Sequence, residues 1–216
     1  MAWVDRQVVS IDWDVRTLRI VHFVVRSKGG VGIRKVLSVA IPPDLRAGDP
    51  SAVGQLIRQV LDRERIGAGR MVVDVPRDQA VLNTLKLPAV PDDDLPAMVE
   101  FQVSKELPFP LTVAAVDFAV ESGDDGSGFR EVLVAAVRKE VVEFYAQVAG
   151  SAGLKLERVG LRPYANRESI NELLGDTRRE RVLFVDVGPV LSEIDVLRGG
   201  RLAFSRAASV AVPKIT

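Results

Sequence analysis

The stretch LFVDVGPVLSEIDVLRGGRLAF, residues 183–204, carries the pattern that decides the fold. It reads as an apolar strand that ends at Asp186 and Gly188, a short turn, and a second strand closed by Gly199 and Gly200. Asp and Gly are common turn residues, and they also occur in loops that bind phosphate. The stretch alone is therefore consistent with an ordinary hairpin or with a phosphate loop.

A related pattern lies near the start of the chain. VVSIDWDVRTLRIVHF, residues 8–23, is also an apolar strand that ends in an Asp-containing turn and continues into a second strand. Asp12 corresponds to Asp186, and Asp14 corresponds to Gly188. Because each hairpin opens an α/β unit, the repeat indicates an internal duplication.

Strand and helix signals alternate after the first hairpin. The hairpin and the next β-branched run predict three strands, and a helix follows, with Asp49 as N-cap and Pro50 in the first turn. The helix is expected to stop near Gly67. The apolar run 70–76 fits a buried parallel strand that the helix reaches as a crossover.

The pattern changes in residues 77–159. A strand, a helix with an acidic cap, two strands around the polar tip 122–128, a second helix and a last strand predict a compact α+β insertion. A further helix is expected over 162–176, and the charged segment 177–181 marks a boundary before the second hairpin.

Composition excludes several functional classes. Lys+Arg and Asp+Glu both total 29, so no net charge attracts the chain to nucleic acid. The chain has no cysteine, which excludes disulfides and Cys–metal sites. The single histidine, His22, lies in a β-rich run and is expected on a strand face rather than as a general base. His-based triads and His–metal clusters are thereby excluded.

The N-terminal residues and the hydropathy predict a soluble protein. Acidic residues stand where a signal peptide needs a basic start and an apolar run. No apolar segment approaches the ~20 residues of a membrane-spanning helix. A cytoplasmic location is expected.

The paired hairpins resemble the two phosphate-binding segments of the actin-like ATPase superfamily. More narrowly, the chain resembles the N-terminal portion of the PilM family of type IV pilus assembly proteins, which is related to the cytoplasmic domain of the type II secretion protein GspL and to FtsA. The segments that carry the resemblance are LNTLKLP (82–88), EFQVSKELPFPL (100–111), VDFAV (116–120), VLVAAVRKEVVEFYAQVAGSAGLKL (132–156) and VDVGPVLSEIDVLRGGRLAFSR (185–206).

The resemblance implies an α/β, actin-like (ribonuclease H-like) fold with an insertion. Residues 1–76 and 160–177 would form actin-like subdomain 1A. Residues 77–159 would form the inserted 1C-type α+β subdomain, and 181–216 the start of a second, truncated half.

Nucleotide binding is expected to be weak or absent. Superfamily members that bind ATP place small residues after the first Asp, whereas Asp14 here brings negative charge to the phosphate position. Arg16 and Thr17 could still meet a phosphate oxygen, but Pro189 follows Gly188 in the second hairpin. Six positions are thus expected to be vestigial phosphate-loop residues, and they are Asp12, Asp14, Arg16, Thr17, Asp186 and Gly188. No catalytic residue, no metal site and no cofactor is expected in this fragment, and ATP with Mg²⁺ is possible only in an intact relative.

The resemblance implies a non-catalytic scaffold at the cytoplasmic side of a bacterial inner-membrane platform. It would bind the short cytoplasmic peptide of a PilN-like single-pass membrane protein, with a motor ATPase as a further partner and only indirect membrane contact. Phe101, Phe109 and Leu111 could line the peptide groove or simply pack inside the insertion. A truncated nucleotide-binding actin-like ATPase or kinase, and a GspL-like cytoplasmic domain, are the alternatives.

Overall fold

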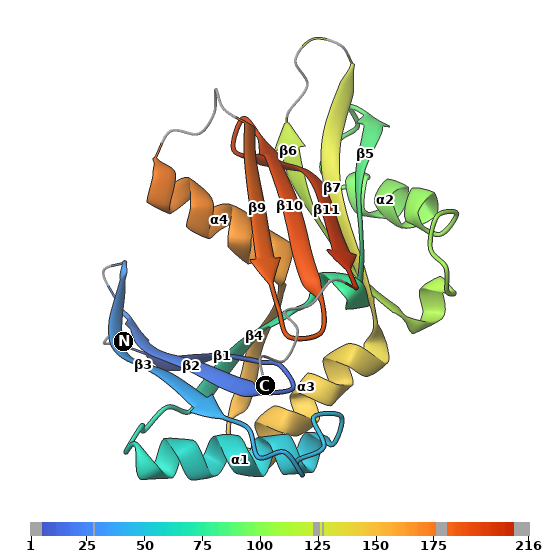
Figure 1. The fold of residues 1–216 in the computed structure, drawn as a ribbon. Coiled ribbons are helices and arrows are strands. Elements are labelled where there is room, and N and C mark those ends of the chain that lie inside the picture. The colour runs from blue at the N-terminus through green and yellow to red at the C-terminus, as the bar shows by residue number, and fades with distance from the viewer. Residues whose placement is uncertain (1–5, 28, 123–125, 127, 176–180, 210–216) are drawn as a thin grey trace.

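A computed structural model shows a mixed α/β protein built around three β-sheets (Figure 1). The structure describes residues 6–27, 29–122, 126, 128–175 and 181–209 of the 216-residue chain. Most of the polar hairpin tip at 122–128 and of the charged boundary at 177–181 lies outside the described residues.

The first sheet contains the N-terminal hairpin. Its strands, in spatial order, are β3 (Val31–Ala40), β2 (Thr17–Val25), β1 (Arg6–Trp13), β4 (Arg70–Val75) and β8 (Lys155–Leu161). The first three pair antiparallel, and β4 and β8 run parallel to β1. Helix α1 (Pro50–Arg63) connects β3 to β4, and the predicted order of three strands, a helix and a parallel strand is confirmed.

Two helices cover one face of this sheet. Helix α1 and helix α3 (Lys139–Ser151) lie side by side below the sheet in Figure 1. Asp49 caps α1 as predicted, because its Oδ1 accepts hydrogen bonds from the backbone N–H groups of Ser51 and Ala52. The main core fills the layer between sheet and helices, and its fully buried side chains include Val9, Ile11, Leu18, Ile20, Val53, Ile57, Met71 and Val148.

The second sheet is the insertion. Its strands, in spatial order, are β5 (Ala80–Pro88), β7 (Phe129–Arg138) and β6 (Ala114–Ser122). Helix α2 (Leu95–Val103) follows β5 in the chain and precedes β6. Short 3₁₀ turns at Arg77–Gln79 and Leu111–Val113 precede β5 and β6. A separate core holds this sheet to α2, and it contains Leu85, Leu87, Leu95, Val99, Val103, Val132 and Val134.

The predicted α+β unit over 77–159 was wrong at its C-terminal end. Strand β8 pairs with β4 in the first sheet, with Val159 opposite Val73, and α3 packs on α1. The physical reason lies in β4, whose outer row of backbone groups needs a partner because the strand is buried. The inserted sheet therefore ends with β7.

The third sheet is formed by the second hairpin and one more strand. Helix α4 (Arg162–Leu174), predicted over 162–176, leads into β9 (Arg181–Val187), β10 (Ser192–Arg198) and β11 (Arg201–Ala208). The order is β11-β10-β9, and Leu197 and Leu202 pack with Ile170 of α4.

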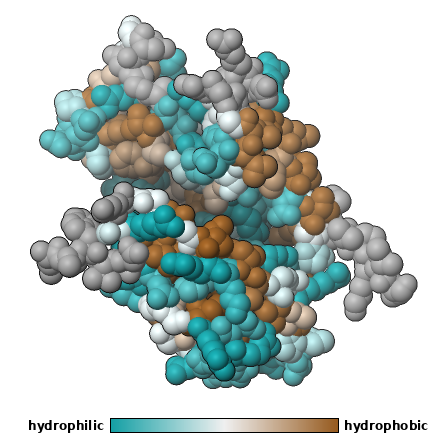
Figure 2. Space-filling view, turned by 90° about the vertical axis from the view of Figure 1, so that its left-hand side faces the viewer, coloured by the Kyte–Doolittle hydropathy of each residue, from teal (hydrophilic) through white to brown (hydrophobic). Residues whose placement is uncertain are grey.

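Apolar side chains remain exposed on the first and third sheets. Figure 2 shows a hollow that divides the molecule on one face, with hydrophobic patches above and below it. The exposed apolar side chains of these two sheets include Val31, Ile33 and Val36 on β3, and Leu183, Val185 and Val187 on β9.

Candidate functional site

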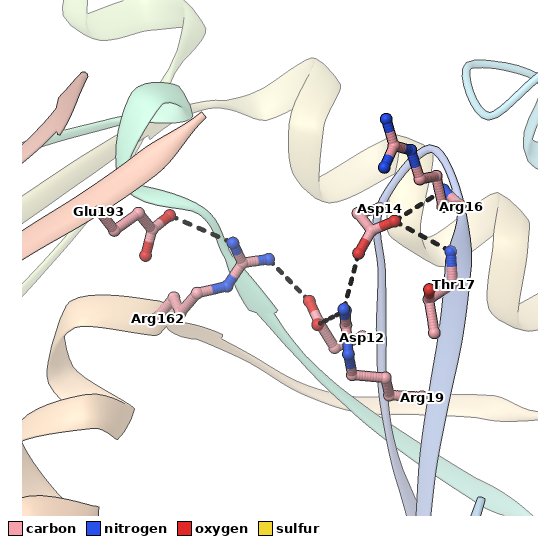
Figure 3. Close-up of polar contacts among 7 residues, drawn as sticks. All are labelled: Asp12, Asp14, Arg16, Thr17, Arg19, Arg162 and Glu193. Carbon is pink, nitrogen blue, oxygen red and sulfur yellow. Dashed lines mark hydrogen bonds and ion pairs between the residues drawn. The ribbon is translucent and has the colours of Figure 1, made fainter. Parts of the chain in front are cut away.

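The turn between β1 and β2 already holds a carboxylate at its centre. Asp14 Oδ1 accepts hydrogen bonds from the backbone N–H groups of Arg16 (2.6 Å) and Thr17 (2.9 Å), and Oδ2 pairs with the Arg19 guanidinium at 2.7 Å (Figure 3). Burial raises the pKa of Asp14, but these hydrogen bonds outweigh it, so that the pKa lies below its usual value. The amides that a phosphate loop would offer to a ligand are therefore satisfied within the turn.

Arg162 joins the two related hairpins. It is the first residue of α4, and its guanidinium lies 2.6 Å from Asp12 Oδ1 on β1 and 3.2 Å from Glu193 Oε1 on β10 (Figure 3). The same Glu193 oxygen accepts the backbone N–H of Arg77 at 2.9 Å. The positive charge of Arg162 thus lies between a carboxylate of the first hairpin and a carboxylate of the second.

Glu193 is the most deeply buried member of this network, with 3% of its surface exposed. Burial raises its pKa, and the Arg77 amide and Arg162 only partly oppose that effect. Neither Glu193 nor Arg162 was predicted as a site residue. A glutamate inside an apolar strand was the one available signal, whereas nothing near Arg162 in the sequence indicated its partners.

The second hairpin is closed by its own backbone. The Gly188 N–H donates to the Leu191 carbonyl at 3.1 Å, and a methyl group on Gly188 would lie 2.4 Å from that oxygen. Position 188 therefore requires glycine, because a side chain would collide with the Leu191 carbonyl. The Gly188 amide is hydrogen-bonded within the turn. Asp186 is exposed and stands opposite Glu193 in the strand register.

The residues present do not fit a nucleotide with its metal ion. Asp14 occupies the amides of the first turn, Gly188 bonds within the second, and Arg162 supplies the positive charge between Asp12 and Glu193. Among the described residues, no group of three or more His, Cys, Asp or Glu side chains could hold a metal ion.

A groove of about 680 Å³ lies between the inserted sheet and the first sheet with its neighbouring helices. Residues 115–119 of β6 form one wall and residues 158–161 of β8 the other, and β6 and β8 are edge strands of their sheets. Val142 of α3 and Tyr164 of α4 also line it. The groove is mainly apolar and has a strand edge on each side.

The three predicted groove residues lie elsewhere. Phe101 is on α2 with 65% of its surface exposed, and Lys105 Nζ lies 3.8 Å from its ring centre. Phe109 packs under the Arg138 guanidinium at 4.6 Å, and Leu111 begins the 3₁₀ turn before β6. None of them is among the residues that line the groove. Sequence reasoning missed Tyr164 and the β8 wall, because the pairing of β8 was not predicted.

Across the part of the chain that the structure describes, no helix is both long enough and apolar enough to cross a membrane.

Comparison with known proteins confirms the predicted fold and resemblance. The chain from the structure of the PilM–PilN type IV pilus biogenesis complex superposes with a TM-score of 0.82 at 21% identity. The match covers 97% of this chain and 63% of that one, so this chain spans less than two thirds of the relative's length. The cytoplasmic domain of EpsL, an inner membrane component of the type II secretion system of Vibrio cholerae, superposes with a TM-score of 0.55 at 13% identity, over 94% of this chain and 71% of that one.

These likenesses show the actin-like α/β fold. The family model described as type IV pilus assembly protein PilM matches residues 10–216. The chain therefore belongs to the PilM family of type IV pilus assembly proteins.

Proposed function

We propose that the chain is a non-catalytic scaffold on the cytoplasmic side of the inner-membrane platform of a type IV pilus or a related type II secretion system. Its family membership supports an assembly role, and the relative of known structure was solved as a PilM–PilN complex. The partner would be a short cytoplasmic peptide of a PilN-like single-pass membrane protein. Membrane attachment would then be indirect.

The groove between β6 and β8 is the observation that carries this proposal. Five consecutive residues of β6 and four of β8 line it. Because strand side chains alternate between faces, a wall of consecutive residues presents the edge of a strand with its backbone groups. An extended peptide adds to such an edge through main-chain hydrogen bonds and places alternate side chains in pockets.

The side chains of the groove favour a peptide with apolar anchors. Alternate residues of β7 contribute apolar surface, as does Val142 of α3, and Arg158 and Tyr164 add polar groups; the β7 residues are Leu133, Ala135 and Val137. The Phe118 amide is bonded to the Asp117 carboxylate at 2.8 Å, so this edge amide is satisfied in the free protein. A bound peptide strand would replace this hydrogen bond with one from the Phe118 amide to a backbone carbonyl of the peptide.

The peptide proposal is tested with synthetic N-terminal peptides of the single-pass membrane proteins encoded beside this chain. We expect one of them to bind, and Ala119→Glu to weaken binding at least about tenfold, because a bulky charged side chain would replace a methyl group in the mainly apolar groove. Fluorescence anisotropy measures both. Phe101→Ala, which changes an exposed residue outside the groove, is the control and should bind like the wild type.

Two outcomes would contradict this assignment. Loss of binding in Phe101→Ala but not in Ala119→Glu would move the peptide site to α2. Failure of every peptide to bind the wild-type protein would remove the scaffold proposal in its present form.

Nucleotide chemistry is not part of the proposed function. Calorimetric titration with Mg-ATP should show no binding in the micromolar range, because Asp14 and Arg162 already satisfy the groups of the two hairpins. The titration is paired with a phosphate-release measurement. Micromolar binding together with turnover would favour a nucleotide-driven ATPase instead.

A further inference from the structure

The first turn of α4 belongs to both the groove and the ion-pair network. Leu161 and Tyr164 line the groove, and Arg162, which lies between them in the sequence, bridges Asp12 and Glu193. A helix turn is rigid on this scale, because its backbone dihedrals are fixed. A displacement of Arg162 therefore moves groove-lining atoms.

A second contact joins the same two regions. Gly160 lines the groove on β8, and a methyl group at Gly160 would lie 2.2 Å from Asp74 Oδ1 on β4. Burial raises the pKa of Asp74, and the nearby charge of Arg162 opposes this rise. The Asp74 carboxylate thus lies against the backbone of the groove wall and within the field of the bridging arginine.

The rest of α4 fixes the helix to the other two sheets. Arg167 forms an ion pair with Glu121 of β6, and the Asn166 side chain donates to Asp195 Oδ2 of β10 at 2.9 Å. Together with Arg162, these residues connect α4 to β1, β6 and β10. The helix cannot shift without breaking one of these contacts.

We infer that Arg162 is a positioning residue for the peptide groove, and that groove occupancy and the bridge between the two hairpins are thermodynamically coupled through the first turn of α4. The inference rests on the proposed function of the groove. With the bridge intact, Leu161 and Tyr164 are held in place before the peptide arrives, and preorganisation of this kind raises affinity. By reciprocity, a bound peptide strengthens the attachment of the third sheet to the first.

The test uses Glu193→Gln, which removes one charge of the bridge at a residue that does not line the groove. We expect the dissociation constant of the bound synthetic peptide to rise about five- to tenfold, within the usual range of coupling between sites. Hydrogen exchange of the amides in 115–119 and 158–161 should also become faster without peptide, while β2 and β3 stay unchanged. Glu131→Gln is the control, because Glu131 pairs with Arg201 only at 3.7 Å in an exposed ion pair.

The outcomes separate this inference from the proposed function. If the wild type binds peptide and Glu193→Gln matches it in affinity and in exchange, the coupling is wrong and the scaffold proposal stands. If no peptide binds the wild type, the scaffold proposal and the coupling to peptide both fail, and the exchange measurement alone decides whether the bridge positions the groove walls. If Glu193→Gln does not fold, Asp12→Asn removes the more exposed partner of the bridge, and the same two measurements apply.

Discussion

Replacing Arg167 with methionine should lower the free energy of unfolding by up to about 3 kcal/mol, the lower end of the cost of removing one partner from a buried ion pair, because this pair is largely but not fully buried. The Arg167 and Glu121 side chains are only 14% and 10% exposed. The substitution leaves the Glu121 carboxylate desolvated without its cation, and it also removes the contact of Arg167 with the Tyr164 ring at 4.3 Å. Chemical denaturation followed by circular dichroism measures the change.

Arg58→Met is the matched control for Arg167→Met. Arg58 pairs with Asp62 at 3.9 Å within α1, and the two side chains are 62% and 74% exposed. Such a pair contributes no more than about 0.5 kcal/mol. The double substitution Arg167→Met with Glu121→Leu should recover much of the loss, because no unpaired charge remains. Equal effects of Arg167→Met and Arg58→Met would mean that Glu121 is solvated and that this contact does not hold α4 to the insertion.

The sequence predicted correctly those elements that depend on residues close together in the chain. The Asp49 cap, the apolar spacing of α1 and the glycine turn at Gly188 each involve residues within one or two turns of one another. The Trp13 ring, in the first hairpin, packs against those of Phe144 and Tyr145 on α3, with ring centres 6.3 and 5.5 Å away. Burial raises the pKa of Tyr145 to about 12, so this cluster stays uncharged.

The contacts that define the candidate site could not be predicted in the same way. Asp12 and Arg162 are 150 positions apart, and no feature of either segment indicates the other. The two walls of the groove become neighbours because β8 pairs with β4. The sequence of an apolar strand does not indicate which sheet the strand joins. Phe101 was a reasonable candidate from its residue type, but α2 turns it to solvent.

The two hairpins that share the sequence pattern differ in their surroundings. In the register that matches Asp12 with Asp186, Ile11 corresponds to Val185. Ile11 is buried in the core between the first sheet and helices α1 and α3, whereas Val185 is exposed on β9. The two hairpins therefore share a sequence pattern but not their surroundings, and the pattern alone could not distinguish a covered face from an open one.

Replacing Gly54 with alanine should lower the free energy of unfolding by about 1–3 kcal/mol, the usual cost of overpacking a core. Gly54 is buried where α1 crosses α3, and an added methyl group would lie 2.4 Å from Ser151 Cβ and 2.6 Å from the Val148 carbonyl oxygen. Neither atom is the end of a flexible side chain, so the two helices must separate. Thermal and urea denaturation measure the loss.

The matched control for Gly54→Ala is Gly150→Ala in α3, where no atom lies within 4 Å of the added methyl group. Alanine is the better helix former by up to about 1 kcal/mol, so this variant should be slightly more stable than the wild type. Adding Ser151→Gly to Gly54→Ala should recover only part of the loss, because the clash with the Val148 carbonyl remains. Stabilisation by Gly54→Ala equal to that by Gly150→Ala would show that α1 and α3 do not meet this closely.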